Sequence, residues 1–176
     1  MAAPPIILQI EDDPNDVFFL QRALTKIGAH NSVRVAKDGQ EAIDYLNGAG
    51  VFSDREEYPM PCMVLLDLKL PHVMGLEVLK WIRLNASAAL IVIILTASAE
   101  ESDIATAYCL GANAFLTKPP EAGKLEEIVR SIQSFWLTHN VWPREPSTYS
   151  FLTDGTVRQR QARDEIRRDA LKAAYA

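Results

Sequence analysis

The segment Cys62-Met-Val-Leu-Leu-Asp67-Leu-Lys-Leu-Pro71 contains five apolar residues followed directly by a carboxylate. A short apolar run of this kind is typical of a strand that is buried on both faces. Such strands belong to parallel sheets, because the crossover helices cover both sides of the sheet. Asp67 then stands at the carboxyl end of the strand, where ligands bind in open α/β sheets. The segment therefore predicts a layered α/β fold with a carboxylate at its functional edge.

The rest of the chain continues this pattern. Four other short runs have strand character, and the segments between them carry apolar residues at helical spacing. The predicted strands cover 6–10, 32–36, 62–66, 90–95 and 114–117, and the predicted helices cover 15–27, 39–46, 76–84, 102–110 and 121–139. With right-handed crossovers, this alternation predicts a doubly wound, flavodoxin-like sheet of five parallel strands in the order 2-1-3-4-5, with helices on both faces.

Composition excludes several other classes of protein. The chain has 176 residues, of which 48% are hydrophobic and 23% charged, so it can bury an ordinary core and is not a disordered chain. A net charge of −5 argues against bulk binding of nucleic acid. No signal-peptide pattern opens the chain, and the longest apolar run, 88–95, is too short to span a membrane. We expect a cytoplasmic protein without membrane contact.

The pattern divides the chain into a domain over 1–142 and an extension over 143–176. The extension begins with the proline-bounded linker 143–146 and continues with a weak helical pattern rich in arginine. It is too short to form a DNA-binding domain with its own core. We therefore expect output through protein contacts and no direct contact with nucleic acid.

Polar side chains follow four of the predicted strands. They are the acids Glu11 and Asp12 after the first strand, Asp67 after the third, Thr96 at the end of the fourth and Lys118 after the fifth. Carboxylates crowded at one sheet edge need a cation, and an all-oxygen site suits Mg²⁺. A hydroxyl and an ammonium beside it can hold a phosphoryl group. With no histidine or cysteine base in the set, a carboxylate is the remaining nucleophile and can form an acyl phosphate.

These motifs identify a family. The chain resembles a response-regulator receiver domain over roughly residues 5–142. Each motif alone is a weak signal, but five in this order on these strands are specific. The motifs are Glu11-Asp12, Leu65-Leu66-Asp67-Leu68-Lys69-Leu70-Pro71 with Gly75, Leu95-Thr96-Ala97, Leu110-Gly111-Ala112 and Thr117-Lys118-Pro119.

The resemblance implies a role for each matching residue. Asp67 would accept a phosphoryl group from a sensor histidine kinase, and Thr96 and Lys118 would hold the phosphoryl oxygens. Phe115 would be the aromatic switch residue whose position reports phosphorylation. The protein would not be an enzyme beyond its own phosphorylation from small donors and its own dephosphorylation.

The resemblance also implies a metal site. Asp12 and Asp67 would bind Mg²⁺ directly, the backbone carbonyl of Lys69 would be a third ligand, and Glu11 would act through water. Asp13 is expected to cap the following helix and not to bind metal, because Asp before Pro is a common helix start. The peptide bond between Lys118 and Pro119 would be cis, as is usual in the family.

Three further motifs narrow the resemblance to the single-domain response regulators paired with bacterial and cyanobacterial phytochromes. They are Asp12-x-x-x-Asp16, Asp44-Tyr45-Leu46 and Ser134-Phe135-Trp136-Leu137. We therefore expect a stand-alone regulator of a two-component phosphorelay that signals through protein contacts or onward phosphotransfer, with a phytochrome as the narrower candidate for its kinase.

The apolar triplet Phe135, Trp136 and Leu137 predicts an interface. Consecutive residues of a helix cannot all face one core, so part of this surface must be covered by the extension 143–176 or by a second chain. We expect a homodimer that uses these three residues.

Two alternatives remain open at this point. An aspartyl-phosphate phosphohydrolase usually carries a second acid two residues after the nucleophile, but this chain has Lys69 there. A receiver that never takes phosphate and acts only as a scaffold is the second alternative, and the joint presence of Asp67, Thr96 and Lys118 argues against it.

Overall fold

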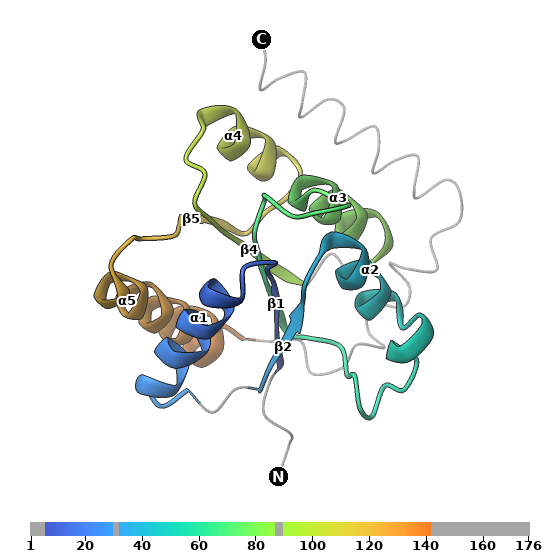
Figure 1. The fold of residues 1–176 in the computed structure, drawn as a ribbon, viewed down its shortest axis with the longest axis horizontal. Coiled ribbons are helices and arrows are strands. Elements are labelled where there is room, and N and C mark those ends of the chain that lie inside the picture. Colours follow the sequence, from blue (N-terminus) through green and yellow to red (C-terminus); the bar gives the residue numbers. More distant parts are fainter. Residues whose placement is uncertain (1–5, 30–31, 87–89, 142–176) are drawn as a thin grey trace.

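The five predicted strands form one parallel sheet. The computed structural model describes residues 6–29, 32–86 and 90–141. Its sheet has the order β2-β1-β3-β4-β5, and each pair of neighbours is parallel (Figure 1). This confirms the predicted fold class. The strands are β1 (Ile6–Ile10), β2 (Ser32–Ala36), β3 (Met63–Leu66), β4 (Ile91–Thr96) and β5 (Ala114–Thr117).

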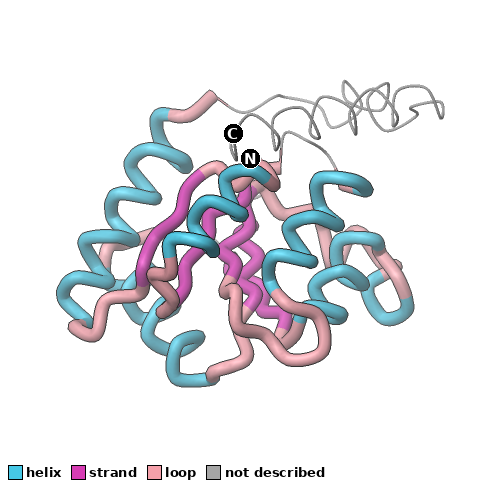
Figure 2. The backbone as a smooth tube through the Cα atoms, turned by 90° about the horizontal axis from the view of Figure 1, so that it is seen from above, coloured by secondary structure: helices cyan, strands magenta, loops and turns pink. Residues whose placement is uncertain are grey.

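Helices cover both faces of the sheet (Figure 2). The helices α1 (Pro14–Lys26) and α5 (Ala122–Ile132) pack against each other on one face. The other face is covered by α2 (Gly39–Asn47), α3 (Gly75–Asn85) and α4 (Glu101–Cys109), and a short 3₁₀ helix, η1 (Gly50–Phe52), follows α2. No helix in the described ranges is long and apolar enough to span a bilayer.

Each face has its own apolar core, because side chains alternate along a strand. Leu8, Val64 and Ile94 point toward α2, α3 and α4. Their neighbours Ile7, Met63 and Ile93 point toward α1 and α5. All four residues of β3 are buried, which explains why its sequence is continuously apolar.

The last predicted helix, 121–139, is present, but its second half is not α-helical. The α-helix ends at Ile132, and residues Gln133–His139 form a π-helix, η2. A π-helix bonds i to i+5 and so rotates less per residue than an α-helix. Trp136 and Leu137 therefore both pack against the core between α1 and α5, whereas Phe135 stays 59% exposed.

The loop between β3 and α3 folds back onto the end of β3. The amide of Gly75 donates to the carbonyl oxygen of Leu68 at 3.0 Å. A side chain at this position would collide with the backbone carbonyl oxygen of Asp67. Glu77 closes the loop by accepting a hydrogen bond from the amide of Met74 at 3.2 Å. Gly75 thus lets the backbone beside Asp67 pack tightly.

We predict that Gly75→Ala destabilises the fold by about 1–3 kcal/mol, because the added methyl group pushes on backbone that cannot move freely. Urea denaturation should show a lower midpoint with an unchanged slope. Gly123→Ala is the matched control, since a methyl group at Gly123 of α5 meets no atom within 4 Å. In a helix this control should be neutral or stabilising. Equal midpoints for Gly75→Ala and the parent would contradict the prediction.

Candidate functional site

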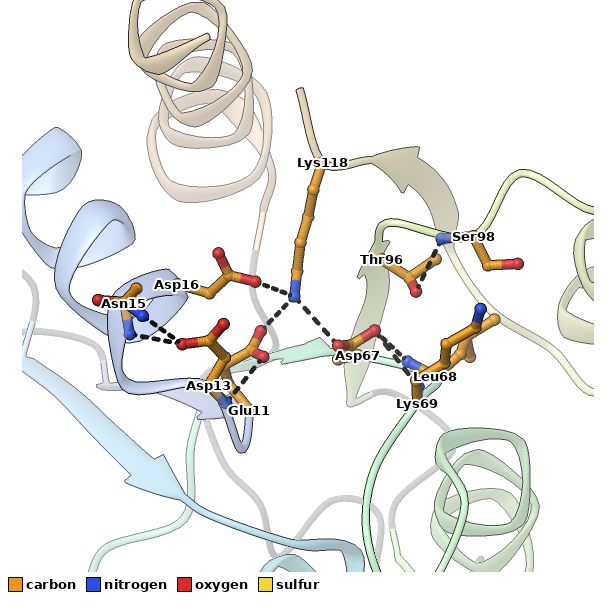
Figure 3. A network of polar contacts seen from close by, with 10 residues as sticks. All are labelled: Glu11, Asp13, Asn15, Asp16, Asp67, Leu68, Lys69, Thr96, Ser98 and Lys118. Carbon is orange, nitrogen blue, oxygen red and sulfur yellow. Dashed lines mark hydrogen bonds and ion pairs between the residues drawn. The ribbon is translucent and has the colours of Figure 1, made fainter. Parts of the chain in front are cut away.

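The carboxyl ends of four strands meet at one edge of the sheet. Ile10 of β1 pairs with Leu66 of β3, and Thr96 of β4 pairs with Thr117 of β5. Each pairing places the residues that come directly after its two strands next to each other. The predicted site residues at this edge are Glu11, Asp12, Asp67, Thr96 and Lys118 (Figure 3 shows all of these except Asp12).

The ammonium group of Lys118 is the centre of the site. Its Nζ lies 2.6 Å from Oε2 of Glu11, 2.7 Å from Oδ2 of Asp16 and 3.0 Å from Oδ2 of Asp67 (Figure 3). A lysine ammonium has three N–H donors, so all three are used. The structure therefore confirms that Glu11, Asp67 and Lys118 come together.

Asp16 is a site residue that the sequence analysis did not assign. It lies in the first turn of α1, and the analysis used it only as part of a family motif. An acid in that turn is common for a reason unrelated to any site, because carboxylates favour the positive end of a helix. The contact between Asp16 and Lys118 joins residues 102 positions apart. Only the packing of α1 above the sheet edge reveals it.

Asp67 is held on both oxygens. Its Oδ1 accepts a hydrogen bond from the amide of Leu68 at 2.6 Å and a longer one from the amide of Lys69 at 3.4 Å. Its Oδ2 faces the ammonium of Lys118. The side chain is only 9% exposed. Hydrogen-bond donors therefore contact both oxygens of a nearly buried carboxylate.

Burial changes the acid–base properties of two groups in the site. Burial raises the pKa of Glu11 to about 7, although the hydrogen bond and the charge of Lys118 oppose the shift. Burial alone would lower the pKa of Lys118, but the hydrogen bonds that Lys118 donates to Asp16 and Glu11 and the nearby negative charges outweigh it and raise that pKa. Lys118 is thus a permanent cation, and Glu11 changes charge near neutral pH.

Three carboxylates in the site could hold a metal ion. One oxygen from each of Glu11, Asp12 and Asp67 lies within 4.8 Å of the other two. Such an all-oxygen donor set fits a hard divalent cation. Asp13 is not among them, because its Oδ1 caps α1 by accepting from the amide of Asn15 at 2.8 Å, as predicted.

Thr96 is fully buried beside this centre. Its Oγ1 accepts a hydrogen bond from the amide of Ser98 at 3.3 Å, and the hydroxyl of Ser98 donates to Asp103 of α4 at 2.9 Å. The backbone amide of Lys118 donates to the carbonyl oxygen of Thr96 at 2.8 Å, but in the described part of the chain no side-chain hydrogen bond joins Thr96 to Asp67 or Lys118. Its role toward a phosphoryl group stays a prediction.

Two other predicted roles stay predictions. The amide of Lys69 faces Asp67, but its carbonyl oxygen makes no contact that would test the ligand role. Phe115 is half-buried on β5 and packs against the core under α2, α3 and α4, which suits core and switch roles alike.

The prediction of a cis peptide bond before Pro119 is wrong. No cis peptide bond occurs among the described residues. The trans form is intrinsically preferred before proline by about 0.5–1 kcal/mol.

The raised pKa of Glu11 predicts a pH dependence of stability. The folded-state pKa of about 7 exceeds the ordinary value of 4.5, so between these values the folded protein binds more protons than the unfolded protein. The free energy of unfolding must then fall as the pH rises through this window. Denaturation in EDTA should show the fall in the parent, and Glu11→Gln should remove it. Glu100→Gln, at an exposed acid before α4, is the control and should keep it.

Comparisons with known proteins agree with this arrangement. Residues 7–130 match the family described as Response regulator receiver domain. The Probable methanogenesis regulatory protein FilR2 of Methanothrix harundinacea is 36% identical over 147 residues, which cover 81% of this chain and 88% of that protein. Response regulator Rcp1 of Synechocystis sp. is 36% identical over 135 residues, which cover 76% of this chain and 90% of that protein.

Solved structures extend the likeness to three dimensions. The Mn(2+)-bound form of Rcp1 has a TM-score of 0.72 at 34% identity, covering 80% of this chain and 99% of that chain. The phosphorylated cyanobacterial phytochrome response regulator RcpA has a TM-score of 0.75 at 33% identity, with the same coverage. The chain therefore belongs to the response regulator receiver domain family, the phosphorylation-dependent receivers of two-component signalling, and its relatives include phytochrome response regulators.

Proposed function

We propose that Asp67 is the phosphoacceptor of this receiver and that Mg²⁺ is the cation of its site. One observation carries the proposal. A nearly buried carboxylate has an ammonium on one oxygen and backbone amides on the other, beside two more carboxylates that complete a cation site. The donor set suits Mg²⁺, which takes one or two carboxylates and keeps water and phosphate oxygens as its other ligands.

In the transfer, a new P–O bond forms to one oxygen of the Asp67 carboxylate. The bond between phosphorus and the donor breaks, and its electron pair leaves with the donor. Lys118 stands where it can donate to a phosphoryl oxygen, since its Nζ already contacts Oδ2 of Asp67. A bound Mg²⁺ adds positive charge beside the transferred group. Lys118 and the amides next to Asp67 hold the carboxylate in place.

We propose that Thr96 donates its hydroxyl proton to a phosphoryl oxygen. The hydroxyl already accepts from the amide of Ser98, so its own proton is available as a donor. Full burial of Thr96 keeps water from competing for that proton.

The phosphohydrolase alternative is less well supported. The position two residues after Asp67 is occupied by Lys69, whose side chain is exposed and supplies no carboxylate. We therefore propose a protein that is phosphorylated and later loses the group, and not one that turns over phosphate esters.

The first test is the intact mass after incubation with acetyl phosphate. We expect the parent to gain one phosphoryl group with Mg²⁺ and none with EDTA, and Asp67→Asn to gain none. Asp13→Asn is the matched control, because it removes a nearby carboxylate yet keeps a good helix cap. Rapid donor hydrolysis without an adduct would favour the phosphohydrolase. No adduct and no hydrolysis would favour the scaffold.

We propose a sensor histidine kinase of the phytochrome class as the physiological donor. The support is the likeness to RcpA and the shared motifs around Asp16 and Phe135. The same mass assay, with an autophosphorylated bacteriophytochrome kinase as donor, should show faster transfer than with a sensor kinase of another class. Equal rates from both kinases would contradict this pairing.

We also propose a homodimer through a groove between β5 and α5. The groove is lined by Leu116, Ile128, Ile132, Phe135 and Trp136. Phe135 is 59% exposed and stacks edge-to-face on Trp136, so an aromatic pair is presented at the surface. Aromatic side chains of this kind dominate the energetics of many interfaces.

Sedimentation velocity tests the dimer. Phe135→Ser should raise the dimer dissociation constant by at least about tenfold, since it removes an exposed aromatic side chain that the dimer would bury. Phe18→Ser is the control, because Phe18 on α1 is 56% exposed but lies outside the groove. A parent that is monomeric at all concentrations, or two variants with equal effects, would contradict the proposal.

A further inference from the structure

Lys118 has no spare donor in this site. Its three N–H groups face Glu11, Asp16 and Asp67. A phosphoryl group on Asp67 brings new oxygens that also need the ammonium. Lys118 must therefore give up one carboxylate, or turn away from it, when the phosphoryl group arrives.

We infer that Asp16 is a positioning residue that holds Lys118 on the α1 side and so restrains its move toward the phosphoryl group. The inference rests on the proposed role of Asp67 and deepens it. Asp16 touches neither Asp67 nor any predicted metal ligand through a hydrogen bond in the described part of the chain, and it acts through Lys118 alone.

Distances place the ammonium nearer to its two lateral partners than to the phosphoacceptor. Nζ is 2.7 Å from Asp16 and 2.6 Å from Glu11, but 3.0 Å from Asp67. Glu11 and Asp67 follow neighbouring strands, whereas Asp16 belongs to the helix above them. Asp16 is thus the partner that draws Lys118 away from the strand ends.

Burial identifies Asp16 as the partner that Lys118 can release most easily. The side chain of Glu11 is 4% exposed, whereas that of Asp16 is 39% exposed. A carboxylate near water regains hydration when its cation leaves, but a buried one does not. The Asp16 contact is therefore the adjustable one of the three.

The negative charge of Asp16 also opposes phosphorylation of Asp67. The acids Glu11, Asp16 and Asp67 contact one ammonium, and a carboxylate oxygen of Asp12 lies within 4.8 Å of those of Glu11 and Asp67. Phosphoryl donors are anions, so each excess negative charge near Asp67 opposes their approach. Asp16 adds such a charge and at the same time occupies one donor of Lys118.

The test is the rate of phosphorylation by acetyl phosphate at saturating Mg²⁺, followed by intact mass. Asp16→Asn should speed phosphorylation by roughly three- to fivefold, the range expected for one partly exposed ion pair. Asp13→Asn makes the same change in charge three residues away, caps α1 equally well, and should stay within about twofold of the parent. Asp16→Glu keeps the charge and should return to the parent rate.

Whether Asp16→Asn speeds or slows phosphorylation distinguishes this positioning role from a purely structural one. A variant that only loosens α1 would position Lys118 less well and react more slowly. Nitrogen-15 NMR of the Lys118 ammonium gives a second readout that needs no phosphorylation, and Asp16→Asn should shift its resonance whereas Asp13→Asn should not.

The outcomes are distinct. A faster Asp16→Asn with a normal Asp13→Asn supports the inference. An Asp16→Asn rate equal to or below that of the parent overturns it and leaves the phosphoacceptor role of Asp67 intact. Failure of the parent itself to gain a phosphoryl group contradicts the proposed function, and the role of Asp16 with it.

Discussion

The compensation of clustered carboxylates by one ammonium is the constraint on which the site depends. Two like charges about 4 Å apart repel by about 4 kcal/mol at the effective dielectric of a protein near its surface. A domain has only about 5–15 kcal/mol of net stability. Lys118 contacts three of the acids at 2.6–3.0 Å and so offsets part of this cost. The remaining negative charge is what makes the site receptive to a divalent cation.

The fold delivers this arrangement through the central strand. β3 is buried along its whole length, so the position of Asp67 at its end is set by two cores and not by a flexible loop. Gly75 then allows the following loop to close against the backbone of Asp67. Asp67 follows a fully buried strand, whereas Lys118 follows β5 and Asp16, the most exposed acid that pairs with Lys118, belongs to α1. The rigid and the adjustable parts of the site thus belong to different elements.

Much of this could be predicted from local patterns. The strand over 62–66 differs from β3 by one residue, and the strand order follows from the alternation of elements and from crossover handedness. The cap formed by Asp13 follows from Asp before Pro. The helical span 121–139 follows from its apolar spacing, but the π-helical geometry of Gln133–His139 could not be predicted, because seven residues are too few for an apolar pattern to distinguish i+4 from i+5 hydrogen bonding.

The sequence by itself determined which residues stand at the carboxyl edge. Apolar periodicity locates each strand, and parallel strands end on the same side, so Glu11, Asp67, Thr96 and Lys118 had to be neighbours. Only the tertiary structure decided which acids pair with Lys118 and which group has a shifted pKa. The pair between Asp16 and Lys118 exists because α1 packs over the sheet edge, and the raised pKa of Glu11 exists because the surrounding elements exclude water. Burial depends on tertiary packing, and so do contacts between residues far apart in the sequence. Local sequence patterns contain no information on either.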